Sequence, residues 1–258
     1  MIASLPMYWR AQNAPLWQAF WAQVQACAAP AGLTLPDLTP PEAIPRPWAE
    51  HWLRQDLVLS MTCGLPFRDA LRGRVCYVGT LDFGLGTPAG YYRSCVIMSP
   101  GAWAASAAAP TEPPAMTLAC NSADSQSGWA VTQQAPPFAR PPRIAQVLMT
   151  GSHAASAEAV AEGRADIAYI DAVTYRILCE CGFDTRRVHM AGYSAPSPGL
   201  PLICAAGRDP APLRHALKQA LDSFRPDRPN RMGGPMSLHL LDEADYLDLP
   251  IPVPPATA

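Results

Sequence analysis

Residues 144–171, IAQVLMTGSHAASAEAVAEGRADIAYID, determine the fold class that the sequence predicts. The apolar run 144–149 reads as a strand buried on both faces, as parallel strands usually are. An alanine-rich helix follows, with Ser152 as its N-cap and Gly163 in the position that often ends a helix. A second strand covers 165–170, and Asp171 lies just beyond its carboxyl end. The pattern predicts a strand–turn–helix–strand unit.

The turn of this unit is a candidate anion site. Thr150, Ser152 and His153 lie at the start of a predicted helix, where unpaired backbone N–H groups and the helix dipole favour negative charge. A plain helix cap is the alternative reading of Ser152. Similar hydroxyl-rich turns follow two other predicted strands, at residues 62–64 and 125–128. In open α/β sheets, ligands bind beyond the carboxyl ends of the strands, and the three turns would all lie there.

The other predicted elements alternate in the same way and indicate an α/β protein with largely parallel sheets. Helices are predicted over 14–28, 48–54, 128–133, 173–181 and 210–224, and one more follows Thr62. Strands are predicted over 2–8, 57–60, 75–80, 91–98, 116–121, 188–193 and 200–205. Residues 101–114 carry little information and are expected to be exposed, and residues 250–258 to form a loose tail.

Composition excludes several classes of protein. The 258 residues are 49% hydrophobic and 16% charged, which is typical of a compact globular chain. The formal net charge is −2 and no basic run stands out, so we expect no nucleic-acid partner. No apolar stretch is long enough to span a bilayer, so we expect no membrane insertion. We find no Walker or GxGxxG motif and no zinc-type cysteine spacing, and we therefore expect neither a cofactor nor a metal.

Eight cysteines are scattered along the chain without a pairing pattern. No signal peptide is recognisable after Met1. Both observations favour reduced thiols and a cytoplasmic location for the chain as given, because disulfides persist in oxidising compartments. A periplasmic location is the alternative if a signal peptide has been removed or the start is misassigned.

Five segments together resemble a known family. They are LSMTCGLPF at 59–67, YYRSCVIM at 91–98, NSADSQSG at 121–128, TGSHAASAEAVAEGRADIAYID at 150–171 and SAPSPGLPLI at 194–203. In this order they are similar to the phosphate/phosphonate ABC-transporter substrate-binding proteins, which have the type II periplasmic-binding-protein fold. The resemblance covers almost the whole chain.

The resemblance implies two α/β lobes, each a mostly parallel sheet flanked by helices, joined by two crossing segments. Lobe 1 would hold residues 1–92 and 195–258, and lobe 2 would hold residues 93–194. It also implies a small anionic ligand, phosphate or phosphonate-like, bound in a cleft between the lobes. An ABC-transporter permease would be the protein partner.

The resemblance also implies the binding residues. The anionic group would be held by Ser125, Ser127 and Gly128 on one turn and by Thr150, Ser152 and His153 on the other. Asp171 would receive a cationic or hydroxyl part of the ligand, with a helix N-cap as the alternative role. Thr62, Tyr8, Tyr92 and Arg93 would contribute from the first lobe and the hinge, although a hinge salt bridge is the alternative for Arg93.

Three readings of the function follow from these features. The first is non-catalytic binding of a small anion, as the substrate-binding component of a transporter or as a cytoplasmic relative. The alternative is a cytoplasmic synthase- or dehydratase-like enzyme on the same fold, in which His153 or Asp171 acts as acid or base. A third reading is a ligand-responsive module that docks on a partner. We expect no catalytic residues.

Overall fold

The computed structural model describes residues 1–108, 114–134 and 142–256. The chain forms two compact units. Unit 1 comprises Met1–Tyr91 and Pro198–Pro250, and unit 2 comprises Tyr92–Ser197 and the chain from Ile251 onward. Residues after Ile251 group with unit 2 because Val253 O accepts a hydrogen bond from Trp129 Nε1 at 2.9 Å. The predicted lobe boundaries at 92/93 and 194/195, with the tail in lobe 1, stay a prediction.

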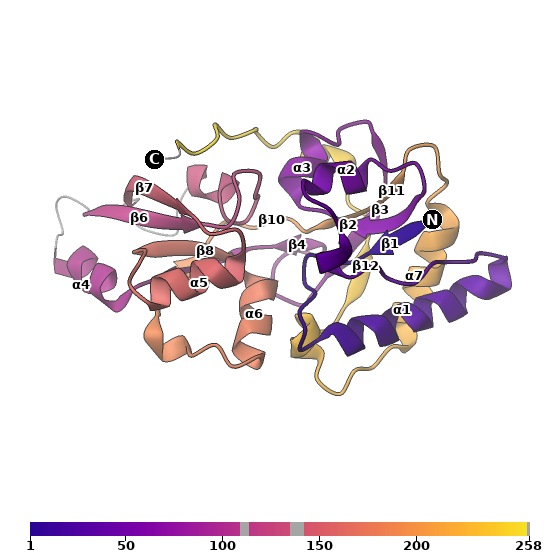
Figure 1. Ribbon diagram of the computed structural model, residues 1–258, viewed down its shortest axis with the longest axis horizontal. Helices are drawn as coiled ribbons and strands as arrows, with labels where there is room; N and C mark the ends of the chain where they lie inside the picture. The colour runs from indigo at the N-terminus through magenta and orange to yellow at the C-terminus, as the bar shows by residue number, and fades with distance from the viewer. Residues whose placement is uncertain (109–113, 135–141, 257–258) are drawn as a thin grey trace. The chain divides into compact units, whose positions relative to one another are not determined.

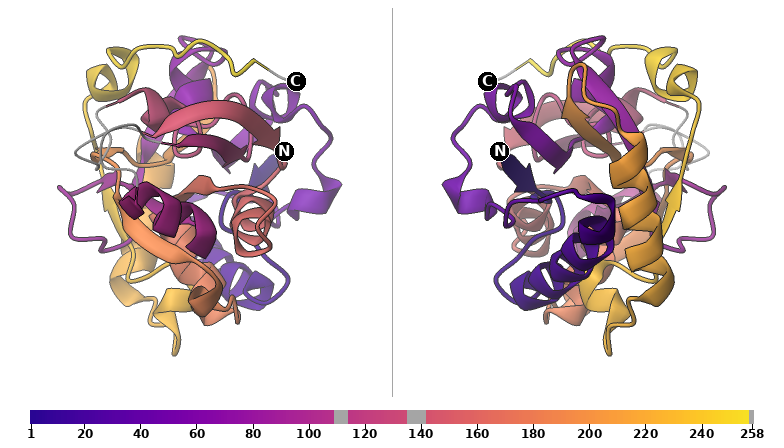
Figure 2. Two further views of the ribbon diagram at one scale, coloured as in Figure 1. Left: turned by 90° about the vertical axis from the view of Figure 1, so that its left-hand side faces the viewer. Right: turned by 90° about the vertical axis from the view of Figure 1, so that its right-hand side faces the viewer.

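Unit 1 is built on one five-stranded sheet in the order β1-β2-β11-β3-β12. Helices α1 and α7 pack side by side, as Figures 1 and 2 show. The strands are β1 Ile2–Ser4, β2 Leu57–Met61, β3 Val75–Asp82, β11 Pro201–Ala205 and β12 Ser237–His239. The helices are α1 Ala14–Ala28, α2 Trp48–Trp52, α3 Gly64–Arg68, α7 Ala211–Ser223 and α8 Glu243–Leu247, with 3-10 turns η1 Ala29–Ala31, η2 Pro41–Ala43 and η5 Pro229–Met232.

Helix α1 has the bounds that its periodicity predicts. A proline lies in its first turn, where a missing N–H costs nothing. Its buried residues recur at helical spacing, so that one face covers the unit 1 core. They are Trp17, Phe20, Trp21, Val24 and Ala28.

Unit 2 is built on a second five-stranded sheet in the order β7-β6-β8-β5-β9. The strands are β5 Ser94–Met98, β6 Ala115–Cys120, β7 Arg143–Met149, β8 Ile167–Asp171 and β9 His189–Tyr193. The helices are α4 Pro100–Ala108, α5 His153–Ala161 and α6 Ala172–Glu180, with 3-10 turns η3 Ala130–Gln133 and η4 Thr185–Arg187. The short strands β4 Tyr91–Tyr92 and β10 Ser197–Pro198 pair with each other where the chain passes between the units.

Strands β5 and β8 of the unit 2 sheet are buried on both faces. Val96 and Met98 of β5 belong to one hydrophobic cluster, and Ile97 between them belongs to another. This split follows from the alternation of side chains along a strand. The second cluster contains Ala157 and Val160 of α5, whose small residues let the helix pack closely on the sheet.

The predicted α/β class with one sheet in each lobe is confirmed, and each sheet has five strands, but the sheets are mixed. β7, β6 and β8 are neighbours in parallel, as expected. β5 runs antiparallel to both of its neighbours, and β11 does the same in unit 1. These are the first long strands after each passage between the units, and each inserts between strands that run the other way.

Three local predictions were wrong, and one helix was not predicted. Strand β7 is largely exposed because it is an edge strand, whereas burial on both faces was predicted. The predicted strand 91–98 is interrupted at Arg93. The segment 101–114 is largely exposed as far as Ala108, as predicted, but it contains the helix α4, which was not predicted. Ser99 Oγ accepts from Ala102 N near the start of this helix, and residues 109–113 lie outside the described residues. The first strand ends at Ser4 rather than at Tyr8.

A buried polar cluster links β1, α2 and β2 in unit 1. The Ser4 hydroxyl is 2.8 Å from His51 Nε2 and 2.8 Å from the Ser60 hydroxyl. All three side chains are buried. Burial lowers the pKa of His51, and the positive charge of Arg54 lowers it further, while Asp56 acts in the opposite direction. The imidazole is therefore neutral in the folded protein near pH 7.

We expect His51 to make stability depend on pH. Because its pKa is lower in the folded state, the unfolded chain binds a proton more readily. The contribution of the neutral His51 side chain to the free energy of unfolding is complete at pH values above its unfolded pKa of 6.5. It declines as the pH falls below that value. The free energy of unfolding should decline by less than about 1.4 kcal/mol per pH unit, the limit for one proton. Urea unfolding of the wild type and of His51→Gln between pH 5 and 7 isolates this dependence. The prediction is contradicted if the free energy of unfolding changes with pH by the same amount in both proteins.

Candidate functional site in unit 2

The turn Ser125–Gly128, called turn A below, follows strand β6. The Ser125 hydroxyl accepts a hydrogen bond from Gly128 N at 2.9 Å, which closes the turn. A Cβ on Gly128 would collide with Asn121 Oδ1 and would come within 3.1 Å of Ser125 Oγ. Only glycine therefore fits at position 128. The helix predicted over 128–133 is a short 3-10 turn, η3.

The turn Thr150–His153, called turn B below, follows strand β7 and opens α5. The Ser152 hydroxyl accepts from Ala155 N at 3.1 Å, so Ser152 is the N-cap. The Thr150 hydroxyl lies 3.1 Å from Cys120 O, 3.1 Å from Ser152 O and 2.6 Å from Ser156 Oγ. A hydroxyl has one hydrogen, and a carbonyl oxygen takes it here. Thr150 therefore shapes the turn.

A side-chain hydrogen bond joins the two turns. Ser127 Oγ of turn A is 2.8 Å from His153 Nε2 of turn B. Ser127 O in turn accepts a hydrogen bond from Ser94 Oγ of β5 at 2.8 Å. The turns meet because β6 and β7 are adjacent and parallel, so their carboxyl ends lie at one edge of the sheet.

Turn A and turn B offer several hydrogen-bond donors. Within the described residues, no acceptor faces the backbone N–H of Ser127 or of Ser152. Ser152 is exposed, and its hydroxyl hydrogen is not used by the cap, in which the oxygen accepts. Such donors at the start of a nine-residue helix suit an oxyanion.

Asp171 lies at the carboxyl end of the third parallel strand, β8. Its Oδ1 accepts from Val173 N at 2.8 Å and from Thr174 N at 3.1 Å. The alternative role as N-cap of α6 is therefore present in the structure. Its side chain is 2% exposed and pairs in register with Ser94 of β5. Its contact with a ligand stays a prediction.

Removing the Asp171 side chain is expected to destabilise α6. Asp171→Ala should lower the free energy of unfolding by about 1–2 kcal/mol, because two backbone N–H groups lose their acceptor. Asp171→Asn keeps a good capping side chain and should cost much less. Urea unfolding of the two variants separates these cases. Equal losses for both variants would mean that the carboxylate charge, rather than the cap, stabilises this region.

The remaining predicted residues lie elsewhere on the chain. The Arg93 guanidinium lies 4.0 Å from the centre of the Tyr193 ring, a cation–π contact within unit 2. Tyr92 is buried. In unit 1, Tyr8 is buried with its ring edge-on to Phe83 at 5.0 Å between centroids. Ligand contacts of these residues stay predictions.

Thr62 is a further predicted residue, and its side chain is buried with a hydroxyl that no described residue satisfies. It lies at the carboxyl end of β2, and its backbone N–H donates to Pro201 O at 3.0 Å. Its hydroxyl is fully buried and has no hydrogen-bond partner among the residues that the structure describes. A buried hydroxyl without a partner is uncommon, and a bound polar group would satisfy it.

The sequence did not single out two residues that organise the turns. Ser94 fixes turn A through the carbonyl of Ser127, and Ser156 bonds the Thr150 hydroxyl. A serine within the apolar run YYRSCVIM could have indicated Ser94, because a polar side chain in a buried strand needs a partner. Nothing in the sequence distinguishes Ser156 from an ordinary helix residue.

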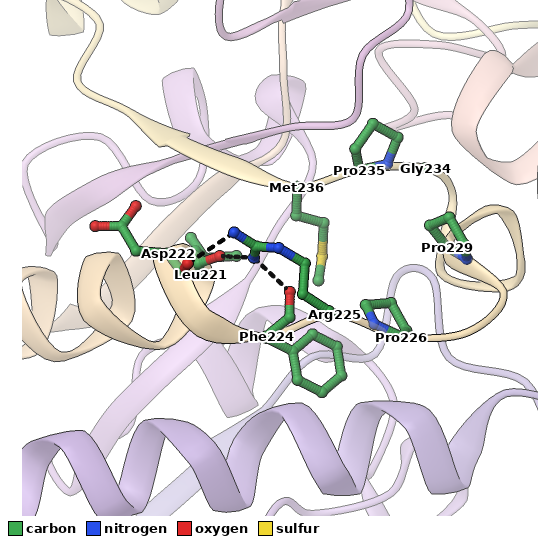
Figure 3. Close-up of a pocket in the computed structure, with 9 residues that line it drawn as sticks. All are labelled: Leu221, Asp222, Phe224, Arg225, Pro226, Pro229, Gly234, Pro235 and Met236. Carbon is green, nitrogen blue, oxygen red and sulfur yellow. Dashed lines mark hydrogen bonds between the residues drawn. The ribbon is translucent and has the colours of Figure 1, made fainter.

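Unit 1 contains a cavity of about 440 Å³ that none of the predicted binding residues lines. Figure 3 shows its lining, which is largely apolar and includes Phe224, Pro235 and Met236. Arg225 also lines the cavity, and its guanidinium donates to the carbonyl oxygens of Leu221, Asp222 and Phe224 at 2.8–3.1 Å. These bonds cap the carboxyl end of α7 and leave the group poorly placed to bind an anion.

A family model identifies the family of the chain. The model for the ABC transporter, phosphonate, periplasmic substrate-binding protein matches residues 86–244, more than half of the 258 residues. The chain belongs to this family. The family consists of substrate-binding components of transporters, so the protein binds a ligand and is not an enzyme. The alternative of a synthase- or dehydratase-like enzyme is not supported.

Solved structures share the fold along nearly the whole chain. XAC2383 from Xanthomonas citri, solved with ATP, is 17% identical over 96% of this chain and 94% of its own, with a TM-score of 0.63. PA3383 of Pseudomonas aeruginosa, a binding component of an ABC phosphonate transporter, is 16% identical over 96% and 83%, with a TM-score of 0.62. PhnD1 from Prochlorococcus marinus, solved with methylphosphonate, is 10% identical over 96% and 94%, with a TM-score of 0.65.

The TM-scores over 96% of this chain show the type II periplasmic-binding-protein fold. No curated protein sequence matches the chain. The family is periplasmic by its description. No helix within residues 1–108, 114–134 and 142–256 is both long and apolar enough to cross a membrane.

Proposed function

We propose that this member of the family binds a phosphonate, or a phosphate-like oxyanion, at turns A and B of unit 2. The observation that carries the proposal is the hydrogen bond of 2.8 Å between Ser127 Oγ and His153 Nε2. It holds two donor-rich turns together at the edge of the sheet where Asp171 also lies. The methylphosphonate bound by PhnD1 belongs to the same class of ligand.

The chemistry of the two turns supports this ligand class. A tetrahedral oxyanion needs several donors, and neutral hydroxyls with backbone N–H groups supply them without burying another full charge. The N–H groups of Ser127 and Ser152 and the Ser152 hydroxyl are three such donors. The His153 imidazole adds a fourth when its proton faces the ligand.

Specificity would come from groups around the anion. Asp171 would receive an amine or hydroxyl of the ligand while it caps α6. The buried Thr62 hydroxyl would bind a further polar atom. Tyr8, Tyr92 and Arg93 would add contacts with the organic part.

The family description supports a role in transport. We propose that the protein acts in the periplasm and delivers its ligand to the permease of an ABC transporter. This replaces the cytoplasmic location as the favoured one, since the whole family is described as periplasmic.

Isothermal titration calorimetry of the dialysed protein tests the proposal. The panel comprises methylphosphonate, aminoethylphosphonate, phosphate, sulfate, ATP, malate and adipate. Saturable one-to-one binding of a phosphorus oxyanion, with at least tenfold preference over the carboxylates, is expected. Preference for a carboxylate, or no heat with any compound, would contradict the ligand class.

A further inference from the structure

Two of the eight cysteines lie directly opposite each other in the unit 1 sheet. Strands β3 and β11 are antiparallel, and their register pairs Cys204 with Cys76. Opposite residues in an antiparallel pair project from the same face of the sheet. The two thiols are thus neighbours, although 128 positions separate them in the sequence (204 − 76).

The spacing of such a pair suits a disulfide. Opposite residues in antiparallel strands have Cα atoms roughly 4.5–5.5 Å apart, and disulfides form at Cα separations of about 4.4–6.8 Å. The side chains interact already: burial raises the pKa of the Cys204 thiol to about 12, with the Cys76 thiol adding to the shift.

Neither of the two cysteines that are buried in strands of unit 2 has a cysteine opposite it in the register of the sheet. Cys95 of β5 is opposite Ile170 and Tyr193, and Cys120 of β6 is opposite Met149. The pairing of Cys76 with Cys204 is therefore a local feature of β3 and β11. Cys95 and Cys120 serve as internal controls.

We propose that Cys76 and Cys204 form a disulfide when the protein meets an oxidant that carries a disulfide. Cys76 is half-buried and Cys204 is fully buried, so the oxidant reaches Cys76 first. The Cys76 thiolate attacks the oxidant R–S–S–R, forming a mixed disulfide and releasing one thiolate R–S⁻. Cys204 then loses its proton and attacks Cys76 Sγ, which releases the second R–S⁻. The protein loses two electrons and two protons, and the oxidant becomes two thiols.

The bond would stabilise unit 1. It would close a loop that contains all of residues 77–203, and such a constraint lowers the entropy of the unfolded chain. A periplasmic protein meets suitable oxidants, whereas cytosolic glutathione and thioredoxin keep thiols reduced. The prediction of uniformly reduced cysteines would then hold only before export.

Peptide mapping of the full-length protein tests the proposal. The protein is equilibrated with oxidised glutathione, free thiols are alkylated, and trypsin is added. Cleavage after Arg74, Arg93, Arg187 and Arg208 isolates peptides 75–93 and 188–208, each with a single cysteine. The expected product is the two peptides linked, with two hydrogen atoms fewer than their sum. The thermal midpoint should rise by roughly 5–10 °C and return on adding dithiothreitol.

Matched variants complete the test. Cys76→Ser should abolish the linked peptide and the thermal shift, and Cys95→Ser should retain both. The proposal is overturned if both peptides remain separate and alkylated, or if either one links to a different cysteine.

Discussion

Replacing Ser127 by alanine is expected to weaken binding of the phosphorus oxyanion by roughly 5- to 150-fold, which corresponds to about 1–3 kcal/mol. The substitution removes the hydroxyl that joins turn A to His153 of turn B at 2.8 Å. Without it, the two turns lose the side-chain hydrogen bond that joins them. Calorimetric titration of the variant with the best ligand of the panel measures the loss.

A serine that caps another helix of the same unit provides the control. Ser99 Oγ accepts from Ala102 N at the start of α4, at 3.2 Å. It follows β5, which runs antiparallel to β8, so it lies at the sheet edge opposite to turns A and B. Ser99→Ala should cost about 1 kcal/mol of stability and leave affinity unchanged. Wild-type affinity in Ser127→Ala would mean that the ligand binds elsewhere.

The largest expected loss of stability follows from Trp17→Ala in helix α1. The Trp17 side chain is 0% exposed, its ring packs edge-on to Phe20, and its Nε1 donates to Tyr8 O at 3.3 Å. Truncation leaves a large cavity and should lower the free energy of unfolding by about 3–5 kcal/mol. Urea unfolding, followed by circular dichroism, measures the difference.

Trp103 is the matched control for this prediction. It lies on α4 with 38% exposure and stacks on His189 at 3.7 Å between ring centroids. Its truncation should cost less than about 1 kcal/mol, because water already covers much of the ring. Comparable losses at positions 17 and 103 would show that α1 does not cover the unit 1 core as described.

The elements best predicted from sequence are those whose local signals agree. Helix α1 combines a first-turn proline with a repeating apolar face, and its bounds are as predicted. The unit from β7 to β8 was predicted from Ser152 and Gly163, which suggested the two ends of a helix. In the structure Ser152 caps α5, and Gly163 follows that helix with a φ of +72°. At that φ glycine is favoured over residues with a side chain.

The elements that were missed or misjudged depend on distant parts of the chain. Strand β7 reads as doubly buried, yet it lies at a sheet edge, and sequence patterns do not show strand order. Strand β12 and helix α8 escaped notice because each is short, although Asp242 caps α8 in a recognisable way. The mixed sheets arise from where β5 and β11 insert, which is a property of the whole topology.

Some features of the candidate site were likewise predictable from the sequence, and others were not. Hydroxyl-rich turns after strands indicated turns A and B, because strand ends are where such sites form. The bond between Ser127 and His153 was not predictable, since 26 residues separate them and β6 must lie beside β7. The role of Thr150 in shaping turn B emerges only from its partners. The N-cap role of Asp171, in contrast, was predicted from the sequence as its alternative role and is present in the structure.

The most direct test of the proposed binding site locates the ligand on the chain. Backbone amide NMR spectra of the isotope-labelled protein are recorded during titration with methylphosphonate. We expect the largest shifts at Ser127, Gly128, Ser152 and His153, whose N–H groups lie in turns A and B. Shifts concentrated instead at the unit 1 cavity, residues 221–236, with turns A and B unchanged, would contradict the proposed site.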